Sequence, residues 1–199
     1  GGSWFLSPTI TSNLFLPFIQ NSIDNFSFDP WSNFLMKGGD VNSFPYGLVM
    51  LIAYLPFSFV GHLIDTNIYD FNFFEIGLKL TSLIFDYLLL VFLSFLTNQN
   101  SKKLLILCYW LSPIAIYTSF IHGQLDIVPI TLLIASLYFL KSNRYKISGV
   151  FFAFAFSSKF SMLISLPFIL VYIYKRRGFQ SEFLKYLISF LITSATLYI

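Results

Sequence analysis

Long apolar runs separated by short polar breaks are the dominant pattern of this chain. Residues 76–96, 104–120 and 127–140 are overwhelmingly apolar. Because a helix needs about 20 mostly apolar residues to cross a bilayer, these runs predict membrane-spanning helices. The sequence has no initiating methionine and ends inside another apolar run, 184–199. We therefore expect a fragment of a longer membrane protein that lacks at least one preceding span.

Two further apolar segments do not fit one ordinary span. Residues 46–60 form a short run that Pro56 interrupts, which is typical of an interfacial or re-entrant segment. Residues 147–174 are too many for one span and include Lys159 and Pro167. This second pattern predicts a hairpin of two short helices with Lys159 near its tip.

The first 75 residues are mixed in character. The part before residue 46 contains four prolines, several Asn and Ser residues, and aromatic side chains that can bury it: Trp4, Phe15, Phe18, Phe26, Phe28, Trp31 and Phe34. We predict an all-α fold, a polytopic transmembrane helix bundle. Residues 1–75 form an outer-face loop with short amphipathic or re-entrant helices. Residues 76–199 form the transmembrane core of about six spans, the last one truncated.

Composition and charge support a membrane protein with a defined orientation. Hydrophobic residues make up 56% of the 199 residues and charged residues 11%, whereas soluble domains carry roughly 25% charged residues. Residues 98–103, 141–146 and 175–177 hold eight of the twelve basic residues and no acidic one. Since basic loops stay on the cytoplasmic side, we expect an acidic outer face. That face carries Asp65, Asp70, Glu75 and Asp126, and also Asp24, Asp29 and Asp40 if residues 46–60 do not cross.

A compact polar break, His122-Gly123-Gln124-Leu125-Asp126, separates two charge-free apolar runs. Its polar residues alternate with small or apolar ones, so on an extended segment they share one face. A bilayer core cannot solvate such groups, and they need a membrane surface or a wet cavity. We interpret the break as a substrate-binding or catalytic segment. The alternative is that Asp126 caps the following helix and His122 lies at headgroup level.

Three charged residues, Lys79, Asp86 and Lys159, lie inside apolar runs. Asp86 follows Lys79 by two helical turns, so both share one helix face. An intramembrane carboxylate is a functional candidate, and the alternative is a buried polar tie between helices. At the outer tip of its hairpin, Lys159 would bind a phosphate, or its side chain would simply extend to the membrane surface.

The first loop offers candidate bases. Asp29 precedes Pro30, which usually marks a turn or a helix N-cap. A carboxylate there, together with Asp126, also suits general-base chemistry on an incoming hydroxyl. Asp24 and Asp40 are the reserve candidates. The chain has no Asp-x-Asp pair, so we expect no cofactor, and a divalent metal has no acidic pair to hold it. It also has no P-loop and no Gly-x-Gly-x-x-Gly motif.

Taken together, these motifs resemble the GT-C superfamily of integral-membrane glycosyltransferases, which use polyprenyl-phosphate-linked sugars. The resemblance covers most of the chain and depends on the order of its motifs: Asp29-Pro30-Trp31, Phe44-Pro45-Tyr46-Gly47, Lys79 with Asp86, Ser112-Pro113, Gly123-Gln124-Leu125-Asp126, and Lys159 followed by Leu166-Pro167. The chain looks most like the mannosyl- or glucosyltransferase members. It departs from the oligosaccharyltransferases because its outer loop has no acidic pair.

The resemblance implies an activity and a set of partners. A sugar would leave a polyprenyl-phosphate donor and join a hydroxyl of a glycan, lipid or protein acceptor, with inversion at the anomeric carbon. The protein would be a multi-pass protein of the plasma membrane or endoplasmic reticulum, surrounded by membrane lipids, with its site on the outer or luminal face. No nucleic-acid partner is expected.

The resemblance also implies residue roles. An Asp of the first outer loop is the base in this superfamily, which maps best to Asp29. Asp126 would line the sugar or acceptor pocket as a second catalytic carboxylate, and Lys159 would offset charge on the phosphate leaving group. The residues expected to bind substrate are His122, Gln124, Lys159, Asp24, Asp40, Lys79 and Asp86.

The competing class is non-enzymatic: a flippase or transporter of lipid-linked sugars, or a membrane scaffold. A transporter predicts ionisable groups along one path through the bilayer. Here Asp86 alone is deep, and the other candidates gather on one face. That distribution favours an enzyme that faces the membrane surface.

Overall fold

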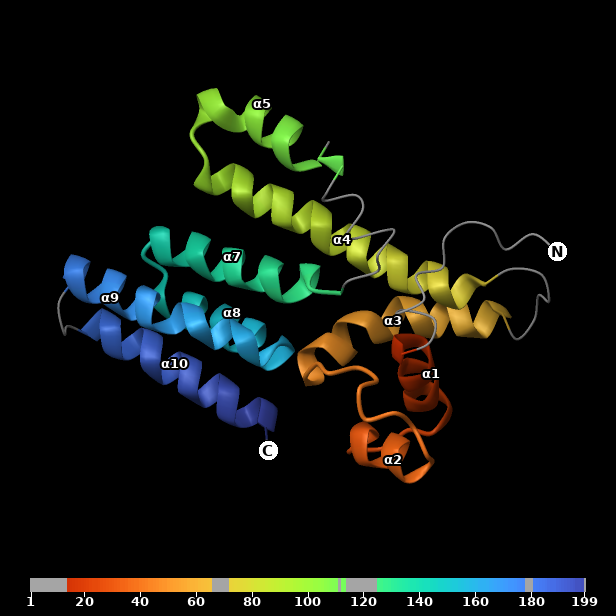
Figure 1. Ribbon diagram of the computed structural model, residues 1–199. Coiled ribbons are helices and arrows are strands. Elements are labelled where there is room, and N and C mark those ends of the chain that lie inside the picture. Colours follow the sequence, from red (N-terminus) through yellow and green to blue (C-terminus); the bar gives the residue numbers. More distant parts are fainter. Residues whose placement is uncertain (1–13, 66–71, 111, 114–124, 178–180, 199) are drawn as a thin grey trace. The chain divides into compact units, whose positions relative to one another are not determined.

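All regular structure in the described residues is helical, which confirms the predicted all-α class (Figure 1). The computed structural model describes residues 14–65, 72–110, 112–113, 125–177 and 181–198. The elements are α1 Leu16–Asp24, α2 Pro30–Met36, α3 Leu48–Asp65, α4 Phe73–Leu96, η2 Gln99–Ser101, α5 Lys102–Leu105, η3 Ile106–Trp110, α7 Ile127–Lys141, α8 Tyr145–Ser158, η5 Phe160–Ser165, α9 Leu166–Arg177 and α10 Ser181–Tyr198.

Contacts within the chain divide it into two compact units, each of which we describe by itself. Unit 1 comprises Gly1–Pro45, Leu51–Ile84 and Trp110–Leu125, and unit 2 comprises Tyr46–Met50, Phe85–Tyr109 and Asp126–Ile199. Both α3 and α4 contribute residues to both units. The predicted domain boundary between residues 75 and 76 stays a prediction.

Two helices of the described chain, α3 and α4, are long and apolar enough to cross a membrane. The apolar helix α7 is shorter, and the predicted set of about six spans stays a prediction. The prediction of a short apolar segment ending near residue 60 is wrong in its length, because α3 continues through Pro56 to Asp65. His62 is accommodated in this extension because its Nε2 lies 3.0 Å from the Asp24 carboxylate.

Unit 1 has an aromatic core around α1 and α2. Phe18 is fully buried and stacks on Phe44 with ring centroids 4.9 Å apart, and Phe34 packs edge-on against it at 5.4 Å. The prediction that aromatic residues bury the first loop therefore holds for this cluster. It is wrong for Phe26 and Phe28, which are 83% and 101% exposed, because they lie in the turn between α1 and α2.

Unit 2 is built around α7, α8, α9 and α10. Phe152 of α8, Ile173 of α9 and Tyr186 of α10 belong to one buried cluster. Helix α10 approaches α8 closely at Gly149, where a Cβ atom would lie only 2.5 Å from the Tyr186 carbonyl oxygen. Small residues permit such close helix–helix packing.

Helices α7 and α8 are also joined by a buried pair of serines. The Ser136 hydroxyl donates to the Ser148 carbonyl at 2.8 Å, and the Ser148 hydroxyl donates to the Ser136 carbonyl at 2.8 Å. Both residues are completely buried. These reciprocal hydrogen bonds fasten the middle of α7 to α8.

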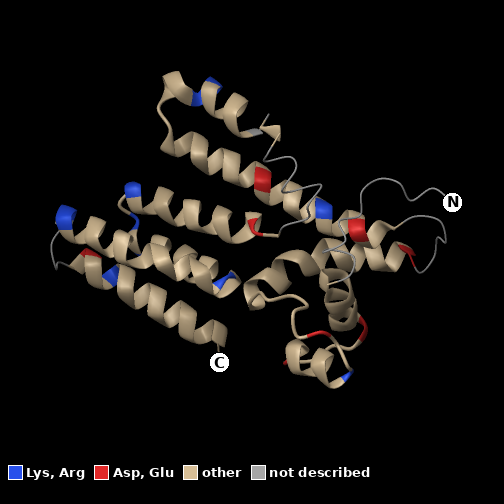
Figure 2. Ribbon diagram, viewed as in Figure 1, with Lys and Arg blue, Asp and Glu red and all other residues tan. Residues whose placement is uncertain are grey.

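Charges gather at one end of unit 2 (Figure 2). Lysines and arginines lie where α7 ends, where α8 begins and where α9 ends. The predicted break in the long apolar run is confirmed, because α8 ends at Ser158 and α9 begins only at Leu166. Lys159 follows α8 with an extended backbone, φ −150° and ψ 118°. The break therefore places Lys159 at the end of α8 away from the basic end.

Candidate functional site

Asp126 and Lys159 form an ion pair in unit 2. The Lys159 Nζ atom donates to both carboxylate oxygens of Asp126 at 2.7 Å. Asp126 stands immediately before α7, and Lys159 immediately after α8. The side chains are 30% and 34% exposed, so the pair is accessible from outside. Two residues that the sequence nominated separately are thus in direct contact.

Tyr46 completes this cluster, and the sequence did not nominate it as a site residue. Its hydroxyl donates to the Asp126 carboxylate at 3.1 Å, and the Lys159 Nζ lies 5.7 Å from the centre of its ring. A tyrosine ring at this distance attracts a cation. The signal in the sequence is the motif Phe44-Pro45-Tyr46-Gly47, which belongs to the resemblance to the GT-C superfamily. We call Tyr46, Asp126 and Lys159 the paired cluster.

The backbone at Gly47 explains how Tyr46 is positioned. The Gly47 N–H donates to the Ser158 carbonyl at 3.1 Å, and a Cβ atom at Gly47 would lie only 1.8 Å from the Ser157 carbonyl oxygen. Only glycine fits this close backbone approach. Phe44 precedes it with a positive φ of 56°, an uncommon conformation for a bulky residue. The backbone at Tyr46 and Gly47 is therefore held next to the end of α8, where Lys159 follows.

The paired cluster can bind an anionic group. Both side chains of the pair are partly exposed, so an incoming phosphate can reach the ammonium group and compete with Asp126 for it. The Ser157 hydroxyl, which neighbours this break, is buried and has no hydrogen-bond partner within the described part of the chain. A lysine, a tyrosine hydroxyl and a carboxylate together can bind a phosphate and polar hydroxyls.

Asp29 is the N-cap of α2 in unit 1. Its carboxylate accepts hydrogen bonds from the Ser32 backbone N–H at 3.1 Å and from the Ser32 hydroxyl. The hydroxyl first, and then the backbone N–H, lower the pKa of Asp29 below its ordinary value of 3.8, because both donors stabilise the charged form. The residue is exposed. The alternative of a capping Asp is therefore observed at this position.

The reserve candidates of the first loop also have local partners. Asp24 pairs with His62 in unit 1. Asp40 accepts from the Asn42 backbone N–H at 2.8 Å, which is the geometry of an Asx turn. These contacts account for both side chains structurally and leave a substrate-binding role as a proposal.

Lys79 and Asp86 have different partners although both lie on α4. Lys79 pairs with Glu75 one turn earlier, at 2.8 Å. Asp86 is 5% exposed and accepts a hydrogen bond from the Tyr109 hydroxyl at 2.6 Å. This contact fits the alternative of a buried polar tie between helical segments.

Two predicted site residues, His122 and Gln124, lie outside the described residues. Among the residues that are described, no group of three His, Cys, Asp or Glu side chains is arranged to hold a metal ion. Within the described residues, the candidate site consists of the paired cluster, whose three side chains contact one another.

Comparison with known proteins gives one family match. The model of glycosyltransferase family 87 matches residues 44–197, which is more than half of the 199 residues. The matched segment includes Tyr46, Asp126 and Lys159 and excludes Asp29. Neither the curated proteins nor the solved structures gave a significant match.

Proposed function

The chain belongs to glycosyltransferase family 87, and from this premise we propose that it transfers a sugar from a polyprenyl-phosphate donor to a hydroxyl acceptor at the outer or luminal face of a membrane. The observation that carries the proposal is the paired cluster, in which Lys159 is held 2.7 Å from Asp126 at the ends of two apolar helices. Mannose or glucose is the sugar that the superfamily resemblance favours. The polytopic, GT-C-like bundle is part of the same proposal.

The chemistry is a direct displacement. The acceptor oxygen forms a bond to the anomeric carbon while the bond from that carbon to the phosphate oxygen breaks. The bonding electrons leave with the polyprenyl phosphate, and the hydroxyl proton passes to a carboxylate. Attack from the side opposite the leaving group inverts the anomeric centre. No further reactant is needed.

We assign different roles to the two catalytic carboxylates. Asp29 accepts the proton, as the superfamily resemblance implies. Asp126 positions Lys159 before the donor arrives and binds sugar hydroxyls afterwards. Each belongs to a different unit, so the two assignments are tested separately.

Lys159 changes partner in this proposal. The phosphate of the donor takes the ammonium group from Asp126, and the Tyr46 hydroxyl keeps its hydrogen bond to the released carboxylate. A cation beside the leaving phosphate stabilises the charge that develops there, and more strongly where water is scarce. His122, Gln124, Asp24, Asp40, Lys79 and Asp86 remain proposed substrate contacts.

The activity is tested with the full-length protein reconstituted in lipid vesicles. We expect transfer from polyprenyl-phosphate mannose or glucose, with an inverted product and no transfer from a nucleotide-linked sugar. The matched pair Lys159→Met and Lys103→Met removes one lysine each, and only the first is expected to lose activity. Movement of intact donor across the bilayer without cleavage of its sugar bond would instead favour the flippase.

The proposed orientation has its own test, cysteine labelling from each side of the membrane. Val41 is 78% exposed and Lys103 is exposed, and we place them on opposite faces. The native Cys108 is exposed, so the single cysteines are introduced in a Cys108→Ala background. Labelling of both positions from the same side would overturn the orientation.

A further inference from the structure

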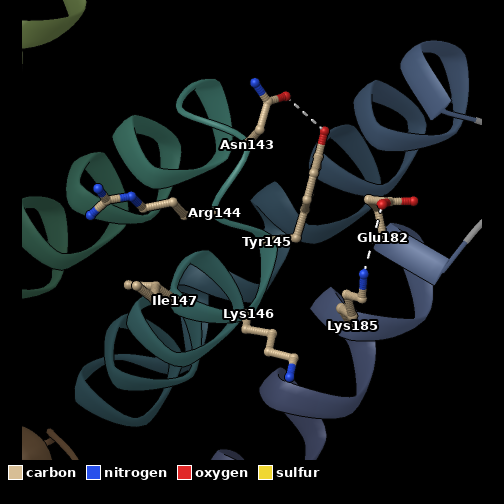
Figure 3. Close-up of a pocket in the computed structure, with 7 residues that line it drawn as sticks. All are labelled: Asn143, Arg144, Tyr145, Lys146, Ile147, Glu182 and Lys185. Carbon is tan, nitrogen blue, oxygen red and sulfur yellow. Dashed lines mark hydrogen bonds and ion pairs between the residues drawn. The ribbon is translucent and has the colours of Figure 1, made fainter.

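A second polar feature of unit 2 lies at its basic end. A cavity of about 520 Å³ is formed where α8 and α10 begin, and its lining includes Arg144, Tyr145, Lys146, Glu182 and Lys185 (Figure 3). Ligand pockets in proteins typically have volumes of about 300–1,000 Å³. The lining therefore includes two lysines, Lys146 and Lys185, and one carboxylate, Glu182, around a space of suitable size for a small polar group.

The cavity carries more cationic than anionic side chains. Glu182 and Lys185 are 3.7 Å apart, near the limit of an ion pair. Figure 3 shows Lys146 and Lys185 on the α10 side of the cavity, whereas Arg144 points away to the other side. The start of the 14-residue helix α8 adds partial positive charge. The cavity is thus suited to an anion such as a phosphate.

Helix α10, which contributes Glu182 and Lys185 to the cavity, also carries an exposed apolar face. Leu184, Ile188, Leu191 and Ile192 of α10 are each more than half exposed, and their spacing of four, three and one residues puts them on one face of the helix. Ile147, which also lines the cavity, is 40% exposed. A cationic pocket at one end of an apolar face matches an amphiphile, with a charged head and a hydrocarbon chain.

We infer that this cavity binds the phosphate of an anionic membrane phospholipid, whose acyl chain lies along the exposed face of α10. Basic pockets between membrane helices on the cytoplasmic side bind anionic headgroups in this way. The site is distinct from the paired cluster, because the length of α8, about 21 Å, separates Tyr145 from Ser158. The inference depends on membrane association and not on the transfer chemistry.

The test measures binding of phosphatidylglycerol to the purified full-length protein in phosphatidylcholine nanodiscs. Each lysine that contacts the bound headgroup contributes about 1 kcal/mol, so the double substitution Lys146→Gln with Lys185→Gln in the cavity lining is expected to weaken binding about thirtyfold. The matched control, Lys102→Gln with Lys103→Gln, removes the same charge from α5 and is expected to retain wild-type binding. Equal loss in both double variants, or loss in neither, would overturn the inference.

Two further measurements distinguish lipid binding from misfolding and from the binding of a free anion. Glu182→Gln removes the carboxylate from the cavity and is expected to tighten lipid binding about fivefold, a change that unfolding cannot produce. Weaker or unchanged binding by this variant would contradict the inference. Inorganic phosphate at the concentration of the lipid is expected to leave the lipid bound. Displacement by phosphate would show a free-anion site and would also overturn the lipid assignment.

Discussion

Asp29 and Asp126 each stand immediately before a helix, yet their carboxylates have different partners. Asp29 caps α2 through the backbone N–H and hydroxyl of Ser32, three residues later. Asp126 makes no side-chain cap and instead contacts Lys159 and Tyr46. An N-cap side chain bonds to the second or third N–H of its helix.

The residue three positions later explains the difference. After Asp126 that residue is Pro129, which has no N–H and no hydroxyl to donate. The proline therefore removes a capping partner and leaves the carboxylate available to a distant lysine. An Asp before a helix is thus a cap or a site residue according to what its own helix offers.

The largest expected effect comes from Asp29→Asn. Asparagine is as good an N-cap as aspartate but cannot accept the proton, so sugar transfer should fall about 10²- to 10⁴-fold. Helix content and donor binding should stay unchanged, and circular dichroism and a donor-binding assay check both. Near-normal transfer would reduce Asp29 to a cap and move the base assignment to Asp24, Asp40 or Asp126.

The next effect removes the partner of Asp126. Lys159→Met keeps length and apolar bulk without the charge, and we expect transfer to fall about 10²-fold with weaker donor binding. Lys159→Arg keeps the charge in a different geometry and should retain part of both. Steady-state kinetics and donor titration measure the effects. Full activity in the methionine variant would return Lys159 to a side chain that merely extends to the membrane surface.

Asp126→Asn is expected to have smaller effects, which are of opposite sign for phosphate binding and for sugar transfer. Without a competing carboxylate, Lys159 should hold the donor phosphate about fivefold more tightly, while transfer slows because the sugar loses a charged contact. Titration with polyprenyl phosphate and a single-turnover assay separate these outcomes. Weaker phosphate binding in this variant would contradict the exchange of partners at Lys159.

The smallest effect sharpens the assignment of Asp29. Ser32→Ala removes the hydroxyl that contributes most to the lowered pKa of Asp29, so that pKa should rise towards its ordinary value. The carboxylate then protonates at a higher pH, and activity dependent on its charged form is lost earlier as the pH falls. The acid limb of the kcat/KM profile should therefore move to higher pH. An unchanged limb would show that another group controls it.

Helices could be predicted from the sequence more accurately than contacts between residues. The runs that became α4 and α7 are long and mostly apolar, and the excessive length of the run 147–174 correctly indicated a helix break. The longer α3 was missed because His62 and Asp65 look like loop residues. In the structure Asp24 pairs with His62, and the Asp65 carboxylate accepts the backbone N–H groups of Phe73 and Phe74 at the start of α4.

The candidate site was predicted only in pieces. Asp126 and Lys159 were both nominated, but their pairing spans 33 residues and no local pattern encodes it. Tyr46 is 80 residues from Asp126, and tyrosines are common at membrane interfaces for other reasons. The absence of a cap at Asp126 was readable from Pro129, because proline chemistry is local.

The reciprocal hydrogen bonds between Ser136 and Ser148 fix how α7 and α8 are aligned along their axes, and the paired cluster depends on that alignment. Asp126 lies ten residues before the first serine, and Lys159 lies eleven residues after the second. At about 1.5 Å per residue, these two segments are nearly equal in length. The Asp126 carboxylate and the Lys159 ammonium group therefore lie side by side where α7 begins and α8 ends. Apolar helix faces alone can slide by a turn, about 5.4 Å, which is twice the length of the ion pair. The two serines thus set the alignment on which a distant charge pair depends.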